Sequence, residues 1–351
     1  MHFASDNAAG IAPEILAAIA RANEGYALAY GNDAWTQRVE RKLAQMFERE
    51  VAVFLTATGT AANALALAHL TPPWGAVLCH DEAHIALDEC GAPEFFGGGI
   101  KLVGLPGAGG KIASETLARA LEGQWGGPHH VSPAVLSLSQ ATEAGTVYQP
   151  HEIAALAELA HARGVAVHVD GARLANALAR MRASPAQTTW KVGVDALSLG
   201  ATKGGAMAAE AVVLFDPAHA KGMPERRKRA GHLVSKHRYI AAQIEAYCDG
   251  DLWLKLARHA NDMADRLAAG LVSGGLEPVW PVQANEVFVA LPAPVDARLR
   301  SEGAAYHPWR TNALPPGVRV SPGASLVRLV TSFATRADDV DRFVATARAA
   351  S

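Results

Sequence analysis

Two hydrophobic periods alternate along the first 245 residues. Short apolar runs rich in β-branched residues are typical of buried strands, and stretches with apolar residues at i, i+3 and i+4 are typical of helices. The predicted strands are Val51–Leu55, Ala76–Cys79, Ile100–Val103, Val135–Leu138, Val165–Val169, Ala196–Leu199 and Val212–Phe215. The predicted helices are Pro13–Ala22, Trp35–Arg49, Ala61–Leu70, Ala113–Leu121 and Ile153–Ala162. This alternation predicts a mostly parallel sheet with helices on both faces.

The pattern changes after about residue 245. A long helical stretch, Leu252–Leu271, leads to a Gly-Gly pair, then to strand-like segments, and a final helix begins at about Ala337. The strand-like segments are Val287–Leu291, Val318–Val320 and Val327–Thr331. We therefore predict a large α/β domain over residues 1–245, which includes the N-terminal segment, and a smaller α+β domain over residues 246–351.

Composition excludes several classes of partner. Lys and Arg number 32 against 34 Asp and Glu, a net charge of −2, which provides no electrostatic footprint for nucleic acid or an anionic membrane. Apolar runs fall far short of the ~20 residues that cross a bilayer. The three cysteines contain no CxxC pair, which disfavours a disulfide scaffold and a zinc module. With no signal peptide visible, we expect a soluble, cytoplasmic enzyme without a metal site.

Polar residues follow the predicted strands, where ligands bind in open α/β sheets. Thr58-Gly59-Thr60 stands between a strand and a helix, so its hydroxyls and N–H groups can hold a phosphate; the alternative is a plain helix cap at Thr58. Asp170 ends another strand and can reach a ligand, or it caps the next helix.

Two further side chains complete this set. Lys203 lies between glycines just past a strand, a place that suits a Schiff base better than a solvated surface. His84 follows a third strand and can stack on a flat ring; the alternative is an ordinary loop histidine. A phosphate cradle, a ring stacker, a buried carboxylate and a Schiff-base lysine together indicate a pyridoxal-phosphate site.

These motifs resemble the threonine aldolases of the aspartate-aminotransferase (fold type I) superfamily, in the β-eliminating-lyase group. The resemblance extends from Ser5-Asp6-Asn7 and Tyr30–Asp33 to Val327–Thr331. It implies an aspartate-aminotransferase-like large domain with a smaller α+β C-terminal domain. It also implies cleavage of threonine, allo-threonine and related β-hydroxy-α-amino acids such as phenylserine to glycine and an aldehyde. An aminotransferase or a β-eliminating lyase of the same fold is the alternative, and a non-catalytic ligand sensor is a third reading.

The resemblance also implies roles for residues. Lys203 would form the Schiff base, Asp170 would pair with the pyridine nitrogen, His84 would stack on the ring, and Thr58, Gly59 and Thr60 would bind the phosphate. Substrate or cofactor contacts would come from four further residues: Arg173 at the phenolic oxygen or the substrate, Arg328 and Ser5 at the substrate carboxylate, and Tyr30 at the rim. Members of the family are homodimers or dimers of dimers with sites at subunit interfaces, so we expect a homotetramer.

Two segments depart from the common family pattern. The family's usual Glu-Asn-Thr-His is replaced by Ser139-Gln140-Ala141-Thr142-Glu143-Ala144-Gly145-Thr146, and its usual Gly-Gly-Gly-Met-Arg-Gln, which normally supplies an arginine, is replaced by residues 230–238. Both resemble the branch of phenylserine aldolases and low-specificity threonine aldolases. Lys236 or Arg238 is therefore the expected phosphate contact, across the subunit interface.

A pair of histidines, His129 and His130, precedes the strand Val135–Leu138. The unperturbed pKa of imidazole, about 6.5, suits acceptance of a hydroxyl proton near neutral pH. We therefore expect one of the two, by its spacing His129, to be the general base; the alternative is an exposed loop.

Overall fold

A seven-stranded sheet forms the centre of the larger part of the molecule, in the order β1-β7-β6-β5-β4-β2-β3. The computed structural model describes residues 1–310, 314–315 and 317–350. The strands are β1 (Ala52–Thr56), β2 (Gly75–His80), β3 (Lys101–Leu105), β4 (Ser132–Ser139), β5 (Ala166–Gly171), β6 (Ala196–Gly200) and β7 (Glu210–Leu214). Only β7 runs antiparallel to its neighbours in this sheet, which confirms the predicted mostly parallel arrangement.

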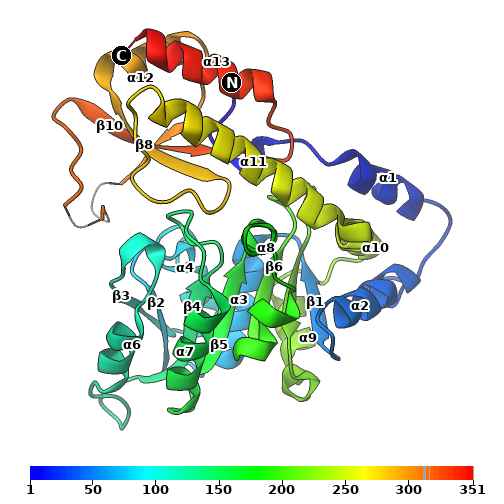
Figure 1. The fold of residues 1–351 in the computed structure, drawn as a ribbon. Coiled ribbons are helices and arrows are strands. Elements are labelled where there is room, and N and C mark those ends of the chain that lie inside the picture. The colour runs from blue at the N-terminus through cyan, green and yellow to red at the C-terminus, as the bar shows by residue number, and fades with distance from the viewer. Residues whose placement is uncertain (311–313, 316, 351) are drawn as a thin grey trace.

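Helices cover both faces of this sheet (Figure 1). The helix α3 (Gly59–Leu70) is buried almost all round because alanines and leucines occupy every side of it. Its Leu65 packs with Phe54 and Val212 on one face. The other face is covered by α1 (Pro13–Ala22), α2 (Ala34–Met46), α6 (Ser114–Leu121), α7 (Pro150–His161), α8 (Leu174–Met181) and α10 (Arg238–Tyr247). Three short helices are α4 (His84–Leu87), α5 (Ala92–Phe96) and α9 (Met223–Arg229).

The smaller part is built on an antiparallel sheet in the order β8-β10-β9. Its elements are β8 (Glu286–Pro292), α12 (Ala293–Ser301), β9 (His307–Pro308), β10 (Ala324–Val330) and α13 (Ala337–Ala349). The predicted strand at Val318–Val320 is wrong. There the Val318 N–H closes a turn to the Pro315 carbonyl, and Val320 packs against the hydrophobic cluster that contains Trp280 and Phe288 rather than pairing with a strand.

One helix joins the two parts. The helix α11 (Leu252–Val272) runs diagonally between them in Figure 1. Its first turns place Trp253 in the core of the large sheet, and its last turns place Leu267 in the core of the small one. Phe3 also packs in the small core, so the first residues join the C-terminal part. We retain 1–245 and 246–351 as a proposed division. Among the described residues, no helix has the length and apolar character of a membrane span.

Strand register fixes what lies at the carboxyl edge of the large sheet. Ser139 at the end of β4 is paired with Asp170 on β5, which is paired in turn with Ser198 on β6. Because these strands are parallel, the segments that follow them leave the sheet side by side.

His168 lies under this edge with no exposed surface. Its Nδ1 is 2.9 Å from the Ser137 hydroxyl and its Nε2 is 2.9 Å from the Ser198 hydroxyl. Burial lowers the pKa of the ring to about 4, from an ordinary value of 6.5, and the nearby Asp170 carboxylate offsets only part of that effect.

We predict that the free energy of unfolding falls as the pH decreases from about 6.5 to 4. The buried ring resists protonation while the unfolded chain takes up the proton, so at pH 5 this residue costs on the order of 2 kcal/mol. Denaturant unfolding at pH 7 and pH 5 measures the effect. His168→Gln should flatten the dependence, whereas His151→Gln, at an exposed position, should leave it unchanged. An equal slope in all three proteins would contradict the assignment.

Candidate functional site

A cavity of about 630 Å³ opens at the carboxyl ends of β4, β5 and β6, where the small sheet meets the large one. Its volume suits a cofactor together with a small substrate. The cavity brings together most of the predicted site residues: Ser5, Thr58, Gly59, Thr60, His84, Asp170, Arg173, Lys203 and Arg328.

The N-terminus of α3 forms one end of the cavity. Thr58 caps the helix, and its hydroxyl accepts a hydrogen bond from the Ala61 N–H at 3.1 Å. The N–H groups of Gly59 and Thr60 belong to the first helical turn and have no carbonyl partner within the helix, so they are available to an anion. A Cβ at Gly59 would meet nothing within 4 Å, so there is open space beside this turn. Thr58 can therefore both cap the helix and take part in an anion site.

Asp170 lies at the end of β5 and is held on both oxygens. Oδ1 accepts from the Ala172 N–H at 3.0 Å, and Oδ2 accepts from the Asn63 amide at 2.8 Å. Burial raises the pKa of this carboxyl, but the positive charges of His84 and Lys203 outweigh burial and leave the pKa below its ordinary value. The group is thus a fixed anion on the cavity wall.

Lys203 follows β6 on a tight, glycine-rich turn. A Cβ on Gly204 would lie 2.2 Å from the Tyr247 hydroxyl, and one on Gly200 would lie 2.6 Å from the Cα of Ala172. Only glycine fits at these two places, because a side chain would collide with Tyr247 at one and with the backbone of Ala172 at the other. The lysine is thereby delivered to the same cavity as Asp170.

His84 begins α4, and a buried network orients its ring. Nδ1 is 2.9 Å from Glu89 Oε1, and the Asn63 amide donates to Glu89 Oε1 at 2.9 Å and to Asp170 Oδ2 at 2.8 Å. The hydrogen bond to Glu89 raises the pKa of His84 despite the opposing effect of burial. Ligand-type atoms of His84, Glu89 and Asp170 lie within 4.8 Å of one another. Because Asn63 donates to both carboxylates, we interpret the group as a hydrogen-bonded network rather than a metal site.

Arg173 is a buried anchor between the two sheets. Its Nε and Nη2 donate to the two oxygens of Asp6 at 2.8 and 3.1 Å, and its Nη1 lies 3.5 Å from Glu286 Oε2. Burial lowers the pKa of the guanidinium, but the carboxylates of Asp6 and Glu286 raise it more. Two of its nitrogens are therefore committed to the protein, and only Nη1 is left for a ligand.

Arg328 is the cavity cation from the small sheet. Trp309 covers it, with the guanidinium carbon 4.4 Å from the ring centroid, and Nη1 lies 3.6 Å from Glu286 Oε1. Its Nε is buried without a hydrogen-bond partner among the described residues. A planar donor fork that is fixed but unsatisfied suits a carboxylate ligand.

Tyr30, Lys236 and Arg238 lie outside this cavity, on a common surface patch. The Tyr30 N–H donates to the Ser235 carbonyl at 3.0 Å, and Arg238 Nη1 donates to the Gly25 carbonyl at 3.2 Å. Tyr30 is half exposed, and Lys236 is exposed. Within one chain, these three residues do not contribute to the cavity.

His129 and His130 are not brought to the cavity. Both are exposed and precede the first residue of β4, whereas Asp170 is level with the last residue of that strand. Eight strand residues at about 3.3 Å each separate the histidines from the cavity edge by roughly 25 Å. Within one chain, the predicted general base, His129 or His130, therefore does not reach the cavity, because both residues precede the strand rather than follow it.

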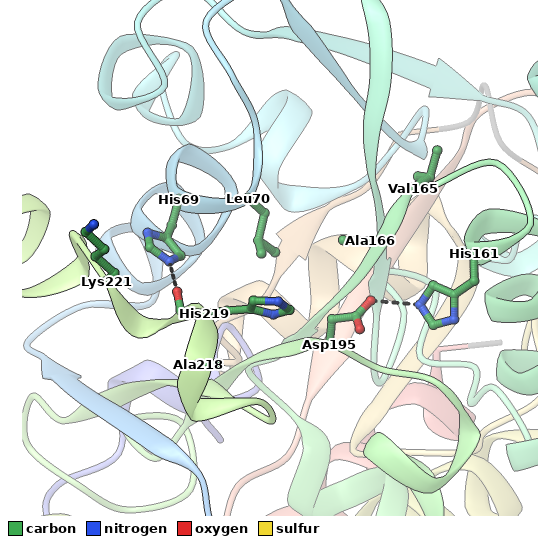
Figure 2. A pocket seen from close by; sticks show the side chains of 10 residues that line it. His69, Leu70, His161, Val165, Ala166, Asp195, Ala218, His219 and Lys221 are labelled. Atoms are coloured by element: carbon green, nitrogen blue, oxygen red, sulfur yellow. Dashed lines mark hydrogen bonds and ion pairs between the residues drawn. The ribbon is translucent and has the colours of Figure 1, made fainter.

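A second cavity, of about 560 Å³, lies at the opposite edge of the sheet (Figure 2). Several of its polar groups pair with one another: His161 pairs with Asp195 at 2.8 Å, and His69 Nε2 contacts the His219 carbonyl at 2.6 Å. Asp195 also accepts from the Val167 N–H at 2.7 Å. These contacts explain the residues as structural, so the first cavity is the candidate active site.

Comparison with known proteins agrees with this geometry. Residues 2–293 match the family model of the beta-eliminating lyases. The chain belongs to that family. A low specificity L-threonine aldolase from Pseudomonas aeruginosa is 44% identical to this chain over 311 residues, 88% of each chain.

Solved structures extend the comparison to the fold. The threonine aldolase of Leishmania major superposes with a TM-score of 0.92 at 29% identity, covering 99% of this chain and 98% of that one. A serine palmitoyltransferase from Sphingomonas wittichii shares the fold at 15% identity, with a TM-score of 0.73 over 100% of this chain and 86% of that one. The predicted fold type I architecture is confirmed.

The sequence patterns do not predict several residues of the cavity. Asn63, Glu89, Glu143 and Trp309 line the cavity, and Asp6 orients Arg173. Asp6 lies in the Ser5-Asp6-Asn7 motif, and Glu143 lies in the segment that departs from the family pattern. Both segments stand out in the sequence, but neither residue has a spacing that assigns it a role. Asn63 and Glu89 lie on or beside helices, where nothing in the spacing marks them.

We predict that Arg328→Lys weakens glycine binding. One ammonium cannot reproduce the two parallel hydrogen bonds of the guanidinium fork, and a charged hydrogen bond contributes enough for a loss of about tenfold or more. Calorimetric titration with glycine measures the change. Arg336→Lys, at an exposed position, is the control. Unchanged affinity in Arg328→Lys would place the carboxylate site elsewhere.

Proposed function

We propose that this protein binds pyridoxal phosphate and cleaves L-threonine, L-allo-threonine and related β-hydroxy-α-amino acids, including phenylserine, to glycine and an aldehyde. The observation that carries the proposal is the convergence of Lys203, Asp170 and His84 from the ends of three strands on one cavity. The relatives named as threonine aldolases supply the reaction class.

The residues present fit the cofactor. Lys203 would hold it through Nζ, Asp170 would accept the pyridine N–H, and His84 would lie against the ring. The N–H groups at Gly59 and Thr60, with the Thr58 hydroxyl nearby, would receive the phosphate. The lowered pKa of Asp170 keeps it anionic, as a partner for a protonated pyridine must be.

The remaining cavity groups would orient the substrate. When bound, pyridoxal phosphate supplies an electron sink for the pair left at Cα. Arg328 and Ser5 would hold the substrate carboxylate, and Arg173 Nη1 is available to the substrate or the cofactor. Fixing the carboxylate decides which bond at Cα is broken, because it sets the rotation of the amino acid about its Cα–N axis.

The assembly is part of the proposal. We propose a homotetramer with sites at subunit interfaces, where Tyr30 and either Lys236 or Arg238 reach the partner's cavity. Exposed apolar side chains support this assembly. Tyr26 and Leu28 are exposed on the segment that contains Tyr30, and Met207 on the cavity wall is 55% exposed. The cytoplasmic location stays a prediction.

A substrate panel tests the proposed reaction. The purified protein with added pyridoxal phosphate should convert L-threonine, L-allo-threonine or L-phenylserine to glycine and acetaldehyde or benzaldehyde, and Lys203→Ala should form neither product. Chromatography of amino acids and a coupled aldehyde assay measure the products. Release of a keto acid together with ammonia would indicate the β-eliminating alternative, and a keto acid without ammonia would indicate the aminotransferase alternative.

Asp170→Asn should retain the cofactor and lose turnover. The amide keeps a hydrogen bond to the ring but removes the charge that stabilises its protonated form, so kcat should fall by about 10²-fold or more. Visible absorbance measures cofactor content, and the aldehyde assay measures kcat. Asp338→Asn, at an exposed position, should behave as wild type. A near-normal kcat for Asp170→Asn would make Asp170 purely structural.

A further inference from the structure

Glu143 is a carboxylate of the cavity wall with one oxygen held and one unassigned. Oε1 accepts from the Ser139 hydroxyl at 2.7 Å and from the His84 N–H at 2.8 Å. Oε2 is buried and has no hydrogen-bond partner among the described residues. A buried carboxylate oxygen without a donor is costly, so such an atom in a ligand cavity indicates a missing partner.

The turn that carries Glu143 is firmly fixed. Thr142 N–H donates to the Thr146 carbonyl at 2.9 Å, and both threonine hydroxyls reach the Gly109 carbonyl, at 2.9 and 2.6 Å. The turn follows Ser139, which is paired with Asp170 across the sheet. Glu143 is therefore presented on the same edge as the predicted cofactor residues, in a constant position.

The other acidic groups of the cavity are already committed. Asp170 accepts on both oxygens, and Glu210 receives the N–H groups of Ala201 and Thr202 on its two oxygens. The side chain of Glu89 has no exposed surface, and its Oε1 is taken by His84 and Asn63. Asp88, the remaining acidic residue of the cavity, forms an ion pair with Arg310 at 3.0 Å. Among these five residues, only Glu143 combines a partly exposed side chain with a carboxylate oxygen that has no partner in the described part of the chain.

His84 is a poorer proton acceptor than its position suggests. Its Nδ1 is already engaged by Glu89 Oε1 at 2.9 Å, and in the proposed function its ring lies against the cofactor, so the ring has other contacts to keep. Burial and the Asp170 carboxylate raise the pKa of Glu143, which makes its anion a stronger base than an ordinary glutamate.

We infer that Glu143 is the catalytic base that accepts the proton of the substrate β-hydroxyl, an inference that rests on the proposed function. The O–H bond breaks and its proton moves to Oε2, directly or through one water. The carbonyl of the aldehyde forms as the Cα–Cβ bond breaks, and the electron pair is left at Cα. Cα then gains one proton to give glycine, so the proton lost at oxygen is balanced and no co-reactant is needed.

Glu143→Gln separates this role from a structural one. The amide oxygen of glutamine can still accept from Ser139 and His84, but the side chain cannot take up a proton. We expect kcat for L-threonine to fall 10²–10⁴-fold. Glycine has no β-hydroxyl, so the glycine concentration at half-maximal change of the cofactor absorbance should stay within about twofold. Exchange of the glycine α-proton in D₂O, followed by NMR, should also persist.

Glu82→Gln is the matched control. Glu82 is a nearby glutamate that also has a buried, unpartnered oxygen, but it does not line the cavity, so this variant should keep full activity. Glu143→Asp keeps a carboxylate and should retain more cleavage activity than Glu143→Gln. If Glu143→Gln does not fold, Glu143→Asp serves as the test variant instead. It should then lose more of the cleavage activity than of the glycine α-proton exchange.

Three outcomes would overturn the inference. Cleavage by Glu143→Gln within threefold of wild type would show that the proton goes elsewhere. Equal losses of cleavage and glycine exchange, in either Glu143 variant, would show a structural role. If the wild-type protein exchanges the glycine proton but cleaves no β-hydroxy amino acid, the proposed function fails and the inference fails with it.

Discussion

The bidentate ion pair between Asp6 and Arg173 determines how the two parts of the molecule meet. Arg173 follows the central strand β5, whereas Asp6 belongs to the N-terminal segment that packs with the small sheet. Asn285 donates to Asp6 at 3.0 Å, and Glu286 lies between Arg173 and Arg328. A buried pair that loses one partner typically costs 3–5 kcal/mol. The pair therefore sets the position of the small-sheet cation relative to the large-sheet anion and lysine.

Charge balance in the cavity follows from this arrangement. The positive charge of Arg328, which is mostly buried, is compensated by Glu286 at 3.6 Å and by the face of the Trp309 ring. Neither contact is a hydrogen bond, so the guanidinium is stabilised in place while its donors stay unused. Lys203 and Asp170 are balanced in the same loose way, through charge rather than direct contact. A site with fixed charges and unspent hydrogen bonds is prepared for a charged, hydrogen-bonding ligand.

Local sequence patterns predict most of the helices and strands, but they predict few of the hydrogen bonds and ion pairs within the candidate site. The helix Pro13–Ala22 was predicted to the residue, because Pro13 marks its first turn and its apolar face repeats at the helical period. Residues 318–320 have the apolar residues expected of a strand, but Val320 packs against the cluster that contains Trp280 and Phe288, which no local pattern reveals. The motif residues at strand ends line one cavity because parallel strands share a carboxyl edge.

The histidines at 129 and 130 show the limit of that rule. Proximity to a strand in sequence has a direction: the residue after a parallel strand reaches the ligand edge, and the residue before it reaches the opposite edge. Glu143 follows β4 and lies in the cavity, whereas His129 precedes β4 and is exposed. Residue type suggested imidazole as the base, but strand polarity decides which side chain meets the ligand. A catalytic role inferred from residue type therefore has to agree with the position of that residue in the sheet topology before it is assigned.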